Sequence, residues 1–263
     1  MGLFASAGRK VCGAAESFAG VCRFAGETLC AFLALPLHPR RFRLCDFLMA
    51  YRRAAYDGLA ITAGMGLLLG VILAFESAAS LRAFGAEIYV SDLLSIGLFR
   101  ELAPLVTAVV LAGRCGGAFA AEIGTMKVDD ELDALSTMGL SPVGFLVPPR
   151  VLAAVLAMPV LTAFAELAGL AGGAGVLCAM GVPPAVYWAR VAGAANLFIV
   201  AFGLSKACLF GLLAGLVGCF AGLNARRAAD GVGAASTSAV VGGIVAIAVA
   251  DGIAAFVCNL WGV

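Results

Sequence analysis

Residues 58–75 read GLAITAGMGLLLGVILAF and contain no charged side chain. A helix needs about 20 predominantly apolar residues to cross the hydrocarbon core of a bilayer. Continued to Ser80, this stretch reaches that length, and four later stretches of the chain reach it too. We therefore predict an all-α, polytopic membrane protein with five transmembrane helices, at roughly residues 58–80, 93–121, 145–180, 193–223 and 236–261.

The composition indicates that lipid, rather than water, surrounds most of the chain. Hydrophobic residues make up 63% of the 263 residues and charged residues 13%, against about 25% charged residues in a typical soluble domain. The mean hydropathy is +1.06. A soluble fold with so few charges would leave large apolar patches in water. The formal net charge of +1 gives no reason to expect a nucleic-acid partner.

The sequence contains no recognisable catalytic or metal-binding pattern. Its nine cysteines are scattered without Cys-x-x-Cys spacing, and its single histidine, His38, stands beside Pro39 in an arginine-rich segment. Zinc sites need clustered His and Cys ligands, so we predict buried structural cysteines, an interfacial His38 and no metal site. Neither a Gly-x-x-x-x-Gly-Lys-Ser/Thr motif nor a His-Glu-x-x-His motif is present. We therefore expect no enzyme activity and no cofactor on this chain.

Positive charges are divided unevenly between the two sides of the predicted membrane domain. Twelve of the 17 Lys and Arg residues fall on the side of the N-terminus, eight of them before residue 54. Only two, Arg82 and Arg190, fall on the other side. Short loops rich in Lys and Arg stay in the cytoplasm. We therefore predict a cytoplasmic N-terminus and a periplasmic C-terminus.

The segment before the first predicted span is amphipathic over residues 11–35. Apolar side chains recur there at helical spacing, while Glu16, Arg23 and Glu27 lie on the opposite face. Such a helix lies in the membrane interface, and the alternative, a sixth crossing, would place the later arginines outside. We therefore expect two parts, an N-terminal cytoplasmic or interfacial amphipathic segment (1–57) and a five-span membrane domain (58–263).

Four charged side chains fall within predicted spans, where an ion at the bilayer centre costs about 2.5–3.5 kcal/mol on insertion scales. At a rise of about 1.5 Å per residue, all four lie about 12–21 Å from the outer ends of their spans. They are Glu101, Glu166, Lys206 and Asp251.

Two interpretations of these charges stay open. In the first, the acids pair with Lys206 and Arg100 and lock the helices together. In the second, which we favour because charges within a membrane mark functional sites, they line a polar belt in a substrate cavity. Arg100 is not expected to reach Glu101 directly, because side chains at i and i+1 on a helix point apart.

The connection 122–144 is predicted to contain a short amphipathic helix, which Gly124 and Thr125 begin and Gly139 ends. A solvated surface helix would explain its acidic side, but the apolar side would have no buried partner on so short a loop. We therefore predict that this helix docks on a partner protein. The docking residues are Met126, Val128, Asp129, Asp130, Leu132, Asp133, Leu135 and Met138.

Residues 100–139, RELAPLVTAVVLAGRCGGAFAAEIGTMKVDDELDALSTMG, resemble the most characteristic block of the MlaE (YrbE) permease family. The likeness covers about residues 40–260 in order. Further matching patterns are SPVGFLVPPR at 141–150, LSKACLFG at 204–211, GVG at 231–233 and the late Asp251.

One departure from the family pattern follows the GVG. Many relatives carry an arginine there in a GVGRAT-like pattern, whereas this chain has GVGAAS with Ala234. Any contact that this arginine makes in relatives is absent here or is made by Arg226 or Arg227.

The resemblance implies the permease subunit of an ABC-type transporter in the cell inner membrane, a homodimer that binds two copies of a cytoplasmic ATPase. ATP and Mg²⁺ would bind to that ATPase, and the helix at 125–139 would be the coupling helix. The substrate would be phospholipid or a similar lipid, exchanged with a periplasmic, outer-membrane-directed carrier that has an MCE domain. The family's substrate-pathway charges correspond to Glu101, Lys206 and Asp251, with Arg100 nearby. The alternative function is a secondary transporter driven by an ion gradient, with the buried acids as a relay.

Overall fold

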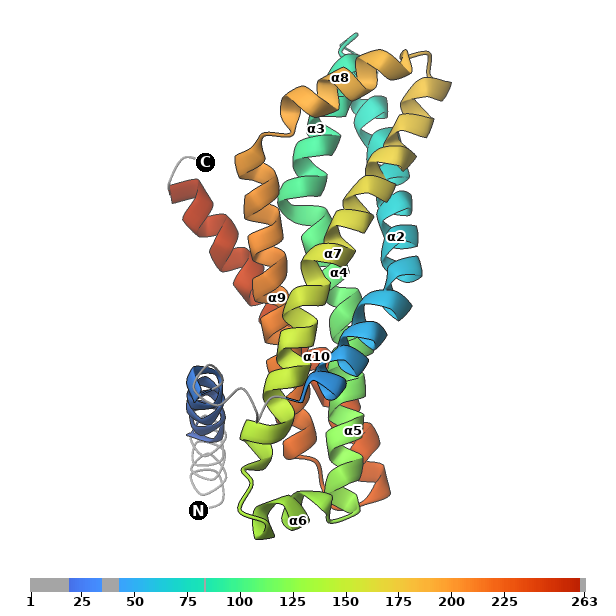
Figure 1. Cartoon of the computed structure of the whole chain (residues 1–263). Helices are drawn as coiled ribbons and strands as arrows, with labels where there is room; N and C mark the ends of the chain where they lie inside the picture. The colour runs from blue at the N-terminus through green and yellow to red at the C-terminus, as the bar shows by residue number, and fades with distance from the viewer. Residues whose placement is uncertain (1–18, 35–42, 83, 261–263) are drawn as a thin grey trace, which may run out of the picture.

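A computed structural model of the protein describes residues 19–34, 43–82 and 84–260. Every regular element in this part of the chain is helical, and the long helices run beside one another (Figure 1). Five of them are long and apolar enough to cross a membrane, which confirms the prediction of an all-α fold with five spans. They are α2 (Leu44–Arg82), the composite helix Glu87–Val128, α7 (Pro142–Ala179), α9 (Leu197–Leu223) and α10 (Ala229–Leu260).

The second span is built from several short pieces rather than one regular helix. Two of the pieces, η3 and η4, are π-helical turns. Such turns change the face that the following side chains occupy and are frequent at functional sites. In chain order the pieces are η2 (Glu87–Tyr89), α3 (Val90–Gly97), η3 (Leu98–Leu102), α4 (Ala103–Leu111), η4 (Ala112–Gly116) and α5 (Gly117–Val128).

Helices α2 and α7 pack closely because α2 presents small residues to α7. A Cβ atom at Gly66 or Gly70 would overlap the backbone of α7 at Ala165 or Gly169. Small residues at a spacing of four allow this backbone approach in membrane helices. The buried positions of α2 follow that spacing along its whole length and are Ala50, Ala54, Gly58, Thr62, Gly66, Gly70, Ala74 and Ala78.

Two short helices mark the opposite ends of the bundle, α6 (Glu131–Thr137) and α8 (Pro184–Ala194) (Figure 1). Helix α6 is shorter than the predicted range 125–139, because α5 continues to Val128 and Asp130 then takes a left-handed conformation with φ of 56°. Gly139, with φ of 75°, follows its end as predicted. Helix α8 was expected only as part of a connection, although Pro183 and Pro184 are a typical helix-start signal.

The N-terminal helix spans residues 19–34 within the predicted amphipathic segment 11–35. The ring centroid of Phe24 lies 5.3 Å from that of Phe220 on α9, whereas Val21, Leu29 and Leu33 are exposed. Apolar side chains on the outer face suit a helix in the membrane interface, and that placement stays a prediction. Residues 11–18, residue 35 and His38 lie outside the described residues.

Candidate functional site

Lys206 forms two ion pairs between three of the membrane helices. Its Nζ atom lies 2.5 Å from Oε2 of Glu101 on η3 and 2.6 Å from Oδ1 of Asp251 on α10. It donates a hydrogen bond to Glu101. The contact with Asp251 is an ion pair only, since that Oδ1 atom has no hydrogen-bonding partner in the described part of the chain. We call Glu101, Lys206 and Asp251 the Lys206 cluster.

The amine of Lys206 is enclosed on its remaining sides. It lies 3.4 Å from the backbone carbonyl oxygen of Arg100 and 5.8 Å from the ring centroids of both Phe202 and Phe210. These ring distances are within the range of cation–π attraction. The Lys206 side chain is only 3% exposed, whereas the side chains of Glu101 and Asp251 are 32% and 18% exposed. The side chains of Glu101 and Asp251 are therefore partly exposed at the surface of the chain, whereas that of Lys206 is enclosed.

The π turn at Leu98–Leu102 explains how residues 100 and 101 both take part. Pro104 has no N–H to donate to the carbonyl of Arg100 four residues earlier, so this carbonyl can accept from Lys206. The turn also brings Nε of Arg100 to 4.0 Å from Oε1 of Glu101. The expectation that these neighbours could not pair is wrong, because it assumed regular α-helical spacing and the chain is π-helical here.

The cluster lies between the two apolar cores of the bundle. Along the second span, Phe99 on η3 belongs to the core nearer α8, and Ala108 on α4 belongs to the core nearer α6. With Arg100, the site contains two cations and two carboxylates. Such a neutral set can bind a polar group by exchanging an internal ion pair for an external one, without leaving a charge unpaired in an apolar surrounding.

Glu166, the fourth charge of the predicted belt, stands apart from these ion pairs. It is 3% exposed on α7, and its Oε1 atom has no hydrogen-bonding partner among the described residues. The same holds for Oγ1 of Thr162 one turn earlier. The structure therefore brings together three of the four charges that the sequence placed at one depth.

The predicted docking helix turns its leucines towards the chain's own core. Leu132 and Leu135 are 8% and 9% exposed, so the inference that the apolar side of this helix has no buried partner within the chain is wrong for Leu132. Two exposed acids of this segment, Asp130 and Asp133, form ion pairs with Arg227 of the α9–α10 loop. Nη2 of Arg227 lies 2.5 Å from Asp133, and its Nη1 lies 3.8 Å from Asp130.

The remaining docking residues differ in exposure. Met126 and Val128 are half-buried, Asp129 is exposed, and Met138 is 66% exposed. Docking on a partner stays a prediction, and the surface available for it is the acidic side of α6 together with Met138.

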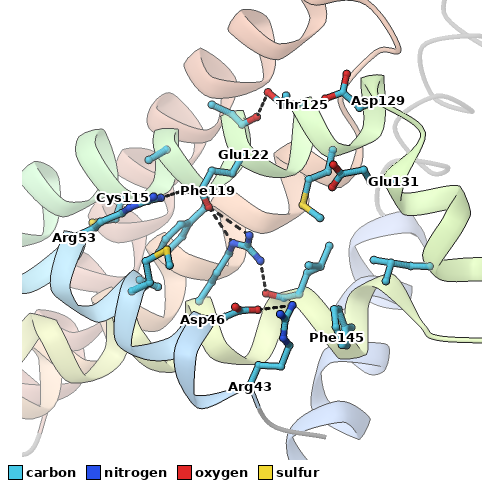
Figure 2. Close-up of a pocket in the computed structure, with 18 of the residues that line it drawn as sticks. Arg43, Asp46, Arg53, Cys115, Phe119, Glu122, Thr125, Asp129, Glu131 and Phe145 are labelled. Atoms are coloured by element: carbon cyan, nitrogen blue, oxygen red, sulfur yellow. Dashed lines mark hydrogen bonds and ion pairs between the residues drawn. The ribbon is translucent and has the colours of Figure 1, made fainter.

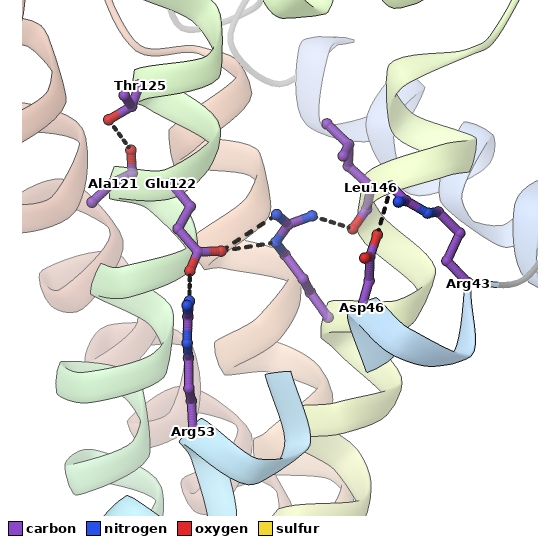
Figure 3. A network of polar contacts seen from close by, with 8 residues as sticks. Arg43, Asp46, Arg53, Ala121, Glu122, Thr125 and Leu146 are labelled. Carbon is purple, nitrogen blue, oxygen red and sulfur yellow. Dashed lines mark hydrogen bonds and ion pairs between the residues drawn. The ribbon is translucent and has the colours of Figure 1, made fainter. Parts of the chain in front are cut away.

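A cavity of about 1150 Å³ lies between α2, α5, α6 and α7 (Figure 2). On its wall, Glu122 of α5 contacts Arg53 of α2 and Arg150 of α7 (Figure 3). We call these three residues the Glu122 junction. No feature of the sequence predicts this junction, because residues 122–144 have the composition of a connection and no spacing rule links positions so far apart.

The sequence is similar to several known proteins. Residues 47–257 match the protein family described as Permease MlaE. A probable ABC transporter permease protein of Synechocystis sp. is 39% identical over 192 residues, which are 73% of this chain and 72% of that protein. The intermembrane phospholipid transport system permease protein MlaE of Haemophilus influenzae is 33% identical over 178 residues, 67% of this chain and 68% of that protein. Protein TRIGALACTOSYLDIACYLGLYCEROL 1, chloroplastic, of Arabidopsis thaliana is 30% identical over 228 residues, 86% of this chain and 64% of that protein.

Proposed function

Because the chain belongs to the MlaE family of ABC transporter permeases, we propose that two copies of it form the membrane-spanning part of a transporter for phospholipid or a similar lipid. As a permease, the chain is a multi-pass membrane protein and a non-catalytic subunit. ATP and Mg²⁺ bind to a cytoplasmic ATPase partner, and a periplasmic MCE-domain protein carries the lipid onward. Membership of an ABC permease family gives no support to the alternative of transport driven by an ion gradient.

The placement of the Lys206 cluster between two apolar cores carries this proposal. A phospholipid has apolar chains and a charged head, and the head needs polar partners wherever it pauses within hydrocarbon. The cores and the lipid-facing helices offer apolar walls for the chains. The name of the Haemophilus relative, a phospholipid transport permease, points to the same class of substrate.

We propose two alternative pairings for this site. Without lipid, Glu101 and Asp251 hold Lys206, as their contacts of 2.5 and 2.6 Å indicate. With lipid, the phosphate meets Arg100 first, since that side chain is 32% exposed. One carboxylate then releases Lys206, which becomes a second partner of the phosphate.

The proposed location is the inner membrane, with α6 in the cytoplasm and the C-terminus in the periplasm. The excess of Lys and Arg on the side of α6 supports this orientation. Asp130 is suited to a test, because its side chain is 71% exposed. In a cysteine-depleted chain with Asp130→Cys, an impermeant thiol reagent should label residue 130 only after the membrane is opened, and labelling from the periplasm would reverse the orientation.

Native mass spectrometry of the purified membrane complex tests the function as a whole. We expect two copies of this chain, two ATPase subunits and bound phospholipid, identified by its mass after release. Hydrolysis of ATP by the same complex should depend on the lipid. A chain that purifies without an ATPase, or an ATPase activity indifferent to lipid, would contradict the proposal.

A further inference from the structure

At the end of the bundle that carries α6, the second span is joined to α2 by charged side chains across a cavity. Further along, α2 packs tightly on α7 through Gly66 and Gly70. Beside the cavity of about 1150 Å³ (Figure 2), by contrast, the described residues of α2 have few direct contacts with α5. A movement of α5 can therefore reach α2 here mainly through side chains that bridge the cavity.

Glu122 makes that bridge from α5, and on the preceding turn η4 Arg114 donates from Nη1 to the carbonyl oxygen of Asp57 on α2. The Oε1 atom of Glu122 accepts a hydrogen bond from Nη1 of Arg53, and its Oε2 atom lies 3.3 Å from Nη2 and 3.4 Å from Nε of Arg150 (Figure 3). Both oxygens of one carboxylate are thus used, each towards a different helix. Bonds in which both partners are charged are stronger than neutral ones and more directional when a guanidinium is the donor.

The two arms of the junction differ in how firmly they are held. Arg150 is 14% exposed and also donates from Nη1 to the carbonyl oxygen of Leu146 at 3.0 Å, so it is fixed to α7. Arg53 is 54% exposed, and Glu122 is its ion-pair partner. The link from Glu122 to α7 is therefore firm, and the link to α2 can open and close.

The junction also stands at a particular place in the chain. Glu122 precedes α6 on α5, and Arg150 follows α6 on α7, so the two helices that hold α6 meet at this carboxylate. We propose that Glu122 is a positioning residue that transmits movement of α6 to α2, and so couples the partner's ATP cycle to the membrane domain. The proposal rests on the proposed function, in which α6 docks on an ATPase.

Glu122→Gln in the full complex, reconstituted in phospholipid nanodiscs, tests this role. The amide keeps the size of the side chain but loses the charge that holds two guanidiniums. We expect lipid-stimulated ATP hydrolysis and lipid transfer to fall by between about twofold and thirtyfold, the range that mutations along a coupling network produce. Thermal stability and co-purification of the ATPase should stay near wild type, because the side chain at position 122 is 35% exposed and a glutamine amide oxygen can still accept a hydrogen bond from Arg150.

Asp46→Asn is the matched control. Asp46 lines the same cavity, but its ion pair, 3.0 Å from Arg43, joins the first turn of α2 to the residue just before it. Arg43 also lies over the ring of Phe145 on α7, but among the described residues this pair forms no ion pair with Glu122 or any other residue of α5. The control should keep its coupling. An equal loss of coupling in Asp46→Asn would show that cavity charge in general matters and would overturn the role of Glu122.

If Glu122→Gln folds poorly, Arg53→Gln provides the test of the coupling role. This variant keeps the contact between Glu122 and Arg150 and cuts only the link to α2. It should lose coupling, and the double variant Arg53→Gln/Glu122→Gln should be no worse than the single ones if they share one link. Full coupling in Arg53→Gln would overturn the proposal alone, whereas a wild-type complex without lipid-dependent hydrolysis would overturn the proposed function with it.

Discussion

The Lys206 cluster and the Glu122 junction have the same arrangement with opposite signs. In the cluster, one cation lies between two carboxylates, and in the junction one carboxylate lies between two guanidiniums. Each joins three helical elements of the bundle. They differ in burial, since the central side chain is 3% exposed for Lys206 and 35% exposed for Glu122.

This difference in burial implies different costs and different uses. A buried ion cannot exchange its partners for water, so each change of partner needs another charged group in the site. An exposed ion pair is close in energy to its hydrated, separated state and can open readily. The cluster is therefore suited to binding a charged ligand, and the junction is suited to a contact that opens and closes during movement.

The largest expected effect is that of Lys206→Ala on transport. The substitution removes both ion pairs and a partner of the lipid phosphate, and we expect lipid transfer to fall more than about tenfold, which corresponds to about 1.4 kcal/mol. Stability should fall by less than the roughly 3–5 kcal/mol typical of a broken, fully buried pair. The remaining carboxylate side chains are 32% and 18% exposed, so the protein does not enclose them fully. Transfer assays and thermal unfolding in detergent measure both quantities.

Lys206→Met/Glu101→Gln separates the two explanations of such a loss. This double variant removes one charge of each sign, so the site keeps its net charge. If the cluster only locked helices together, the double variant should recover both stability and transport. Recovery of stability without transport is the result that the lipid-binding role requires.

The second expected effect concerns α6, next to the Glu122 junction. Leu135→Asp places a carboxylate at a position that is 9% exposed and should destabilise the chain by more than about 1–3 kcal/mol, the cost of a neutral unpaired polar group in a core. Met138→Asp, at a position 66% exposed, should leave stability unchanged and weaken only ATPase binding. Chemical unfolding and co-purification measure the two outcomes. Equal stability of both variants would mean that burial of Leu135 contributes little to holding α6 on the bundle.

The fold was predictable because its signals are long and local. Apolar stretches near the length of a bilayer gave the number of spans, and Gly139 gave the end of α6. The sequence did not give the break at Asp130 or the π turns in the second span. Both depend on backbone conformations that no residue type enforces at those positions, apart from Pro104 near the π turn η3.

The site was predictable where depth in the membrane decides which residues meet. Three charges placed at one depth, Glu101, Lys206 and Asp251, do come together. Depth in the membrane also placed Glu166 with these three charges, because depth does not determine the direction in which a side chain points. The Glu122 junction could not be found, since its residues come from three distant segments, and the burial of Leu132 depends on how α6 folds back on the bundle.

The smallest expected effect is that of Arg53→Gln on stability, and salt should reveal its cause. With side chains 54% and 35% exposed, the pair of Arg53 and Glu122 should contribute about 0–1 kcal/mol. Raising the salt from about 0.1 to 1 M shortens the screening length from about 10 to 3 Å, so the difference in unfolding free energy between wild type and Arg53→Gln should vanish. The corresponding difference for Lys206→Ala should persist, because buried pairs are screened much less. A different result would contradict this picture: a stability contribution of the pair above about 2 kcal/mol that does not change with salt. It would mean that the junction lies in a buried interface and holds the helices together permanently.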